Sequence, residues 1–493
     1  MEDREIAEVE LEPAFGKQSR PEGGHKTAAL VATIVIIEFI SGFTQGYYEP
    51  LIPKFGELLG VDASGLQLFN VVPTAVAALF VPVLTRLGDI KGYRKLLRVV
   101  IPVVFVATVM ILAGVVVESW ALVLVGRLLN GPIACWLPLH IALVYSRTEG
   151  EESTRAVSGI IASMTVGTVV GTASSGFAFG ALGALAPAVA IIPALQLVAV
   201  LLVVFVMPEY QANAHPYIDV KGFVLLGLVM LLAILGFVEV VEGGIDSVVG
   251  ALLIAAAIGV GVAWYRYEKR TDHPAVDVRV LLSKSLFPLY AGAICYGAVF
   301  YGYMSPVATY LAADPSASGY GYAFEPSGIS VVQTLILLFT VVAALELPAV
   351  LKKLPPKPTL LLGFALAFAS FAQWALPGSG LVKLGLLIAL AGLGFGLISA
   401  AIPVIIPMRA PAHERGIATG LFNSAQTLGG ALGGGLFVSL LKVGAGAGGT
   451  ITATGYEVVW VTCAVFMALG FTLVAVFLTR ENKGIEAESE DAR

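Results

Sequence analysis

The chain has 493 residues, of which 57% are hydrophobic and only 13% charged, and its mean hydropathy is +0.88. Because soluble proteins carry about 25% charged residues, this composition excludes an ordinary soluble protein and predicts a polytopic membrane protein. The net charge of −5 adds little, since the distribution of charge along the chain is more informative than its sum.

Apolar runs long enough to cross a membrane recur along the whole chain. A helix needs about 20 apolar residues to span the hydrocarbon, whereas the strands of membrane barrels alternate over about ten residues. The runs therefore predict helices and an all-α fold. We expect fourteen transmembrane spans, near residues 28–50, 65–87, 98–118, 120–146, 156–180, 185–207, 221–241, 247–266, 286–312, 327–350, 358–376, 381–407, 416–441 and 455–479.

The distribution of basic residues supports this count. Cytoplasmic loops of membrane proteins are enriched in Lys and Arg. With fourteen spans and both termini cytoplasmic, the inner loops and tails hold all but four of the 29 Lys and Arg residues. The exceptions are Lys54, Lys383 and Lys442 in outer loops and Arg127 within a span. Removing any one span would invert every later loop and destroy this asymmetry.

The loops divide the chain into two six-helix bundles with a two-helix hairpin inserted between them. Two parallel six-helix halves around a central cavity are a known plan for transporters. The expected units are a cytoplasmic N-terminal tail (1–27), the first bundle (28–207), a connector with the inserted helix pair (208–270), the second bundle with its preceding loop (271–480) and a cytoplasmic tail (481–493).

The stretch "LTRLGDIKGYRK" (84–95) places an acid and several bases in one short turn between two apolar runs. A carboxylate near a helix N-terminus and an arginine can form a latch. The stretch resembles the signature loop between helices 2 and 3 of the major facilitator superfamily. Asp89, Gly92 and Arg94 match the pattern, while Thr85 stands where the family has its first glycine. The resemblance implies that Asp89 and Arg94 form a conformational latch with Gly92 as its hinge. The alternative is a set of inside-positive anchors.

Three further stretches are similar to the same family. "RLLNGPIACWLPL" resembles an Arg-x-x-Gln-Gly pattern, with Arg127 and Gly131 retained and Asn130 replacing the amide. "GTVVGTASSG" resembles the glycine-rich antiporter pattern of helix 5. "WYRYEKRTDHPAVDVRVLLSKSLF" resembles the connector of the fourteen-helix drug/proton antiporter branch. The glycines expected to serve close helix packing in helix 5 are Gly167, Gly171 and Gly176.

Ionisable side chains within the spans are candidate coupling groups, because a charge in the bilayer centre needs a partner or a function. Glu38 lies about 15 Å into span 1, and Arg127 is expected at an overlapping depth in span 4. We hypothesise that Glu38 carries a proton and that Arg127 is its switching partner. A static ion pair between them is the alternative. For His140 in span 4, structural hydrogen bonding is favoured over a proton relay.

Polar and aromatic residues on spans 1, 4, 9 and 13 are candidates for a substrate cavity. Glu38, Ser41, Gln45, Tyr48 and Glu49 recur at helical spacing on span 1, and simple solvation at the outer end of the span is the alternative for Glu49. Aromatic residues on one side of span 9 could stack on a flat solute or simply pack. The predicted cavity residues are Ser41, Gln45, Tyr48, Asn130, Tyr296, Phe300, Tyr303, Asn423 and Gln426.

These features together predict a transporter in the cell membrane rather than an enzyme. The sequence contains no P-loop motif for ATP and no His/Cys cluster for a metal, and its three cysteines lie in apolar runs. We expect no cofactor and no nucleic-acid partner. The expected function is monomeric, proton-coupled antiport of a hydrophobic or amphipathic organic compound, moved outward by alternating access in contact with membrane lipid. Import or proton symport of a small organic solute, lipid transport and a non-transporting scaffold are the alternatives.

Overall fold

The computed structural model describes residues 24–145, 148, 150–207, 219–243, 247–271, 278, 283, 285–376, 378, 380–410, 415–445 and 451–478. These residues form helices and no strands, and helical segments occupy each of the fourteen predicted runs. Ten helices in the described part are long and apolar enough to cross a membrane. The all-α prediction is therefore confirmed, while the count of fourteen spans and the cytoplasmic position of both termini stay predictions.

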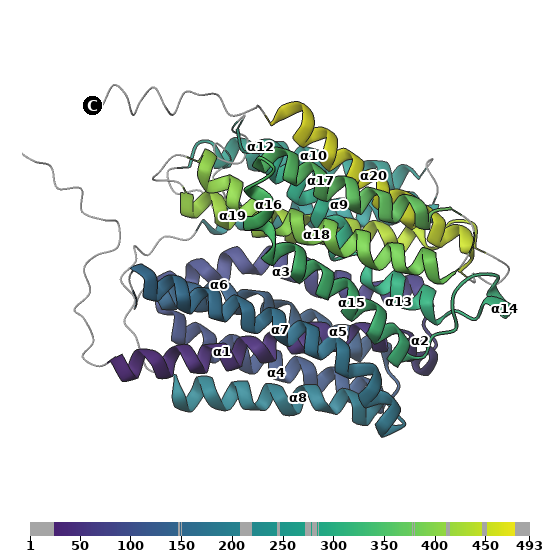
Figure 1. The fold of residues 1–493 in the computed structure, drawn as a ribbon, viewed down its shortest axis with the longest axis horizontal. Coiled ribbons are helices and arrows are strands. Elements are labelled where there is room, and N and C mark those ends of the chain that lie inside the picture. The colour runs from purple at the N-terminus through teal and green to yellow at the C-terminus, as the bar shows by residue number, and fades with distance from the viewer. Residues whose placement is uncertain are drawn as a thin grey trace, which may run out of the picture.

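The first part of the chain folds into helices that lie together in the lower half of Figure 1. Span 4 is broken in the middle by a short 3₁₀ segment (η2) that contains a proline, and span 6 ends in a π-helical turn (η3). The elements are α1 (Gly24–Tyr47), η1 (Glu49–Leu51), α2 (Ile52–Leu59), α3 (Ala63–Lys91), α4 (Tyr93–Val116), α5 (Trp120–Asn130), η2 (Gly131–Cys135), α6 (Trp136–Tyr145), α7 (Gly150–Leu182), α8 (Leu185–Leu201) and η3 (Leu202–Val206).

The remaining helices lie mostly in the upper half of Figure 1. Span 9 is broken after Phe300, and span 10 is broken at Glu346. The elements are α9 (Val220–Gly243), α10 (Val248–Glu268), α12 (Phe287–Phe300), α13 (Met304–Ala312), α14 (Pro315–Ser318), α15 (Pro326–Leu345), α16 (Leu347–Leu351), α17 (Pro356–Trp374), α18 (Leu381–Arg409), α19 (Arg415–Leu440) and α20 (Ala453–Phe477).

Local sequence sets several helix boundaries. The side chains of Asp62, Ser119 and Ser247 cap α3, α5 and α10 by accepting a hydrogen bond from a backbone N–H of the first turn. Such capping satisfies donors that have no partner within the helix. Between α3 and α4, Gly92 adopts φ 98° and ψ 131°, a conformation that favours glycine. The predicted turn at Gly92 is thus present.

Separate buried clusters form within the two parts of the chain. Two clusters draw only on residues between Leu30 and Met207, and the largest draws on residues between Leu286 and Leu478. The parts meet where α3 packs against α19 and α7 against α15. The division into two six-helix bundles remains a proposal, and this arrangement of cores is what supports it.

The helix pair α9–α10 lies beside the contact between α3 and α19. α9 packs against both of these helices, whereas α10 packs mainly against α9. Apolar side chains of α10 point outward, with Leu252 64% and Ile258 63% exposed. An exposed face of this kind suits contact with lipid tails.

Glycines allow the backbones of α1 and α7 to approach closely. A Cβ added at Gly167 would lie 2.2 Å from the carbonyl oxygen of Phe39, and one at Gly171 would lie 2.3 Å from that of Phe43. A Cβ at Gly176 would lie 2.2 Å from the carbonyl oxygen of Pro326 in α15. Small residues at such positions are how membrane helices gain packing energy. The first two glycines thus join α1 to α7, and the third joins the two halves.

We predict that Gly167→Ala destabilises the protein, because the added methyl group must push α1 and α7 apart. The cost is about 1–3 kcal/mol and is measured as a lower midpoint of thermal unfolding in detergent. Gly180→Ala on the same helix is the matched control, since no atom lies within 4 Å of its added Cβ. Equal midpoints for the two variants would contradict the packing role of Gly167.

Candidate functional site

The polar stripe of α1 leads to two separate groups of buried polar side chains. Glu38 (0% exposed) belongs to the first group, and Tyr48 (1% exposed) belongs to the second. Ser41 between them is also buried, while Gln45 is exposed and donates to Ser41 Oγ at 3.2 Å. Ten residues separate Glu38 from Tyr48, which is about 15 Å along a helix.

The first group is a pair between α1 and α6. Glu38 Oε1 lies 2.6 Å from His140 Nδ1, and both side chains are fully buried. Neither Glu38 Oε2 nor His140 Nε2 has a hydrogen-bond partner among the described residues. His140 thus has a hydrogen-bond partner, Glu38, and the choice between a structural role and a proton relay stays open.

The second group surrounds Arg127 at the end of α5. Its Nε donates to the carbonyl oxygen of Phe69 at 2.7 Å, and its other nitrogens donate to the side-chain oxygens of Asn70 (3.3 Å) and Asn130 (3.4 Å). The guanidinium also lies 4.0 Å from the centre of the Phe69 ring, a cation–π geometry. Arg127 is thus held by α3 and by its own helix.

Glu49 completes this Arg127 cluster, in which Tyr48 also lies. Asn70 Nδ2 donates to Glu49 Oε2 at 3.1 Å, so Asn70 bridges the carboxylate and the guanidinium. The centre of the Tyr48 ring lies 5.6 Å from Arg127 Cζ. Asn70 was not singled out from the sequence, and Glu49 was interpreted as a solvated end of span 1. Polar residues at helical spacing in span 2, namely Gln67, Asn70 and Thr74, were the available signal.

Glu38 and Arg127 do not pair in this conformation, and their predicted roles as proton carrier and switching partner stay proposals. The predicted depths rested on an outer boundary near residue 50, but helix continues through η1 and α2 to Leu59. Arg127 therefore lies level with Tyr48 and Glu49, about 15 Å along α1 from Glu38. There the carbonyl oxygen of Phe69 and the side-chain oxygen of Asn70, both on α3, accept hydrogen bonds from the guanidinium.

The latch residues lie at the junction of α3 and α4. Asp89 belongs to the last turn of α3, but its side chain lies outside the described part of the chain. Arg94 is half-buried in the first turn of α4. Gly88 also lies at this junction, and a Cβ there would lie 2.7 Å from Leu139 in α6. The junction therefore packs against the helix that carries His140, and the latch role stays a proposal.

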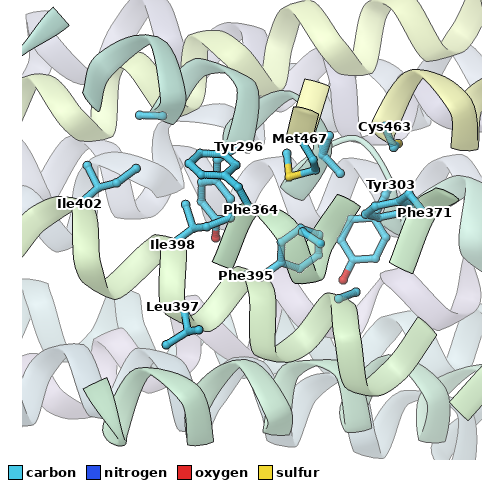
Figure 2. Close-up of a cluster of buried hydrophobic side chains, with 14 of the residues drawn as sticks. Tyr296, Tyr303, Phe364, Phe371, Phe395, Leu397, Ile398, Ile402, Cys463 and Met467 are labelled. Carbon is cyan, nitrogen blue, oxygen red and sulfur yellow. The ribbon is translucent and has the colours of Figure 1, made fainter. Parts of the chain in front are cut away.

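Aromatic residues of span 9 lie inside the second part of the protein (Figure 2). Tyr296 and Tyr303 are fully buried, and the centres of their rings lie 5.9 Å and 5.2 Å from that of Phe395. Phe300 is half-buried and stacks on Tyr296 at 5.2 Å. In this conformation the three rings pack into the core, and their role in a substrate cavity stays a proposal. The hydroxyls of both tyrosines have no hydrogen-bond partner among the described residues.

Span 13 is held close to span 9 by its glycines. A Cβ at Gly429 would lie 2.0 Å from the carbonyl oxygen of Ile294, and one at Gly433 would lie 2.5 Å from that of Ala298. Of the two predicted amides in α19, Asn423 is exposed and Gln426 is 8% exposed. The glycines of α19 thus serve close contact with α12, and a substrate role for the amides stays a proposal.

A comparison with protein families agrees with this helical architecture. Residues 34–434 match the Major Facilitator Superfamily. The chain therefore belongs to the major facilitator superfamily and is a multi-pass membrane transporter. No group of three or more His, Cys, Asp or Glu residues able to hold a metal is present among the described residues.

Several curated relatives resemble the chain over different lengths. The quinolone resistance protein NorB of Staphylococcus aureus is 23% identical over 84% of this chain and 87% of its own. A probable actinorhodin transporter of Streptomyces coelicolor is 28% identical over 82% of this chain and 71% of its own. The uridine/deoxyuridine transporter of Lactococcus lactis subsp. cremoris is 23% identical over 55% of this chain, and the match spans only 57% of that relative.

Solved structures share the fold. A mutant form of the nucleoside transporter NupG superposes with a TM-score of 0.65 over 91% of this chain and 100% of its own, at 14% identity. At this identity the likeness shows the fold alone. It supports the family assignment and leaves the solute open.

We predict that Arg127→Lys destabilises the protein, although it keeps the positive charge. A lysine cannot donate to Phe69, Asn70 and Asn130 together, and each lost hydrogen bond from a charged donor costs about 1.5–3 kcal/mol. The measurement is again the unfolding midpoint in detergent. Arg270→Lys at the exposed end of α10 is the matched control and should leave the midpoint unchanged. An unchanged midpoint for Arg127→Lys would show that its hydrogen bonds contribute nothing measurable.

Proposed function

We propose that the protein is a proton-coupled antiporter that exports hydrophobic or amphipathic organic compounds by alternating access. The observation that carries this proposal is Glu38, a carboxylate with no solvent exposure inside an apolar helix of a transporter fold. A buried carboxylate that binds and releases a proton is a natural coupling group, because burial makes its charge costly. Arg127 is the other predicted proton-coupling residue within a span. Its guanidinium already donates hydrogen bonds to α3 and to Asn130.

Export of organic compounds is supported by two relatives that match most of the chain. One is named for quinolone resistance and one for transport of actinorhodin. Outward transport is the activity by which a membrane transporter confers resistance. The buried aromatic side chains of span 9 suit a solute that is largely apolar and aromatic.

Proton-coupled uptake of a nucleoside is the second candidate. The L. lactis relative is named for transport of uridine and deoxyuridine, and a nucleoside transporter shares the fold. Departures from the antiporter pattern in helix 5 also favour uptake. In the pattern Gly-x-x-x-Gly-Pro-x-x-Gly-Gly, Thr172 stands in place of the proline and Ser175 in place of one glycine. Lipid transport remains a further alternative, and no relative named above supports it.

Proteoliposomes with an imposed pH gradient test the proposal and separate the two candidates. For antiport, an inside-acidic gradient should drive uptake of ethidium or a fluoroquinolone, because protons leave as the solute enters. For symport, an outside-acidic gradient should drive uptake of uridine instead. We predict that Glu38→Gln abolishes the response to the gradient. With a gradient of one pH unit, exchange of one proton for one solute molecule allows about tenfold accumulation of the solute. The Glu38→Gln variant should show no accumulation.

The matched control for this experiment is Glu57→Gln on α2. Glu57 is an exposed carboxylate that pairs with Lys54 at 2.8 Å. Exposed ion pairs of this kind contribute about 0–1 kcal/mol, so the control should retain the response of the wild type. A Glu38→Gln variant with unchanged dependence on pH would contradict the coupling role of Glu38.

The junction of α3 and α4 should control conformational exchange. We predict that Asp89→Asn lowers the rate of transport more than it weakens binding of the solute, because a latch shifts populations between states rather than contacting the solute. Transport is measured in proteoliposomes, and binding by thermal shift of the purified protein. Asn70→Asp in the Arg127 cluster provides the contrast, since it adds a carboxylate beside Arg127 and Glu49 and leaves the junction unchanged. Equal losses of transport and binding in Asp89→Asn would exclude the latch.

A further inference from the structure

The pair formed by Glu38 and His140 has features that a purely structural hydrogen bond would not require. Both side chains are fully buried, and the 2.6 Å contact between Oε1 and Nδ1 uses only one polar atom of each. Glu38 Oε2 and His140 Nε2 remain without a partner in the described part of the chain. Buried polar atoms left unpaired cost free energy. Such a cost is tolerated where the atoms find partners in another conformation.

The surroundings of the pair isolate it from other charges. Among the elements packed against α1, α7 from Ala156 to Leu182, α8 and η3 contain no Asp, Glu, Lys, Arg or His, and Glu49 in η1 belongs to the Arg127 cluster. The elements packed against α6 contribute charged residues in two places. Those near the junction of α3 and α4 are Arg86, Asp89, Lys91, Arg94, Lys95 and Arg98, and those in the first turns of α7 are Glu151, Glu152 and Arg155, of which Glu152 and Arg155 are exposed.

Among the residues at the junction of α3 and α4, one is bound to backbone carbonyl oxygens elsewhere and two are exposed. Arg98 donates to the carbonyl oxygens of Val203 and Val204, and Lys91 and Lys95 are exposed. Cys135 and Tyr145, the other titratable groups beside His140 along the chain, are a buried thiol and an exposed phenol. Among the described side chains, Glu38 and His140 therefore have one another as their only titratable hydrogen-bond partner.

We propose that Glu38 and His140 form a single proton-binding unit and that His140 Nε2 is the atom that exchanges the proton. The role of this unit in transport rests on the proposed function, whereas the geometry of the pair does not depend on that function. With two protons the pair has a net charge of zero, and with one it has a net charge of −1. An apolar environment favours the state of zero net charge.

Proton release follows from this charge balance. When a conformational change brings water to Nε2, the Nε2–H bond breaks, the electron pair stays on the nitrogen, and the proton passes to water. The remaining proton stays between Nδ1 and Oε1. Uptake is the reverse reaction. Because Nε2 takes no part in the Glu38–His140 bond, this unit exchanges a proton with that bond intact.

Nitrogen NMR on the full-length protein tests the unit directly. The sequence has five histidines, so replacing His25, His215, His273 and His413 by Gln leaves His140 as the only imidazole. The ¹⁵N signals of its two ring nitrogens then report tautomer and charge as the pH is changed. We expect Nε2 to change its protonation while Nδ1 keeps its proton, and Glu38→Gln to shift the pH at which this occurs.

A matched control distinguishes the unit from a general effect of buried polar pairs. Gln196 Nε2 donates to Thr44 Oγ1 at 2.7 Å, which is a buried contact between α8 and α1 without a titratable group. Thr44→Val breaks it and should leave the His140 titration unchanged. Constant His140 signals from acidic to alkaline pH, or a titration that Glu38→Gln leaves unaltered, would overturn the proposal.

Transport measurements separate this proposal from the proposed function. His140→Gln should lose the roughly tenfold accumulation supported by one pH unit while retaining exchange of ethidium across vesicles without a gradient. If the wild type shows no gradient-driven transport but the NMR titration is shared by Glu38 and His140, the proposed function fails and the proton-binding unit stands. If His140→Gln keeps both the accumulation and the pH profile of the wild type, the unit itself is wrong.

Discussion

A charged or polar side chain inside the apolar thickness of a membrane must find its partners within the protein, because the lipid tails offer none. In this transporter the constraint arranges the whole first half. Arg127 draws α3 towards α5 through Phe69 and Asn70, and Glu38 draws α6 towards α1 through His140. Each buried charge thus ties together helices that are distant along the chain.

Close backbone contact is the second organising principle, and it works alongside the first. Hydrophobic burial gives little attraction between helices in lipid, so van der Waals contact must supply it. Gly167 and Gly171 bring α7 against α1, while Gly429 and Gly433 bring α19 against α12. These contacts lie within each half and give it rigidity. Gly176 makes the same kind of contact between halves, on Pro326 of α15, and there a conformational change of the transporter would have to break it.

Two buried groups about 15 Å apart along α1 suggest a division of labour. The side chains of Glu38 and His140 are fully buried, away from water, in this conformation. The Arg127 cluster lies beside Gln67, which donates to the carbonyl oxygen of Gly302 in the other half. A solute that displaces contacts of this second cluster would act on α3, whose far end packs against Leu139, the neighbour of His140. α3 therefore connects the Arg127 cluster with the helix that carries His140.

Local patterns in the sequence were enough to predict the helices, the turn at Gly92 and the glycines of close packing, because each depends on neighbours within one or two turns. The candidate charges Glu38 and Arg127 were also recognisable, since ionisable residues are rare in apolar runs. Their partners were not. Whether Glu38 meets Arg127 or His140 depends on how far α1 extends past residue 50 and on where span 4 breaks at η2. A shift of a few residues moves a side chain by several ångströms along the helix axis. Tertiary packing alone decided the pairing.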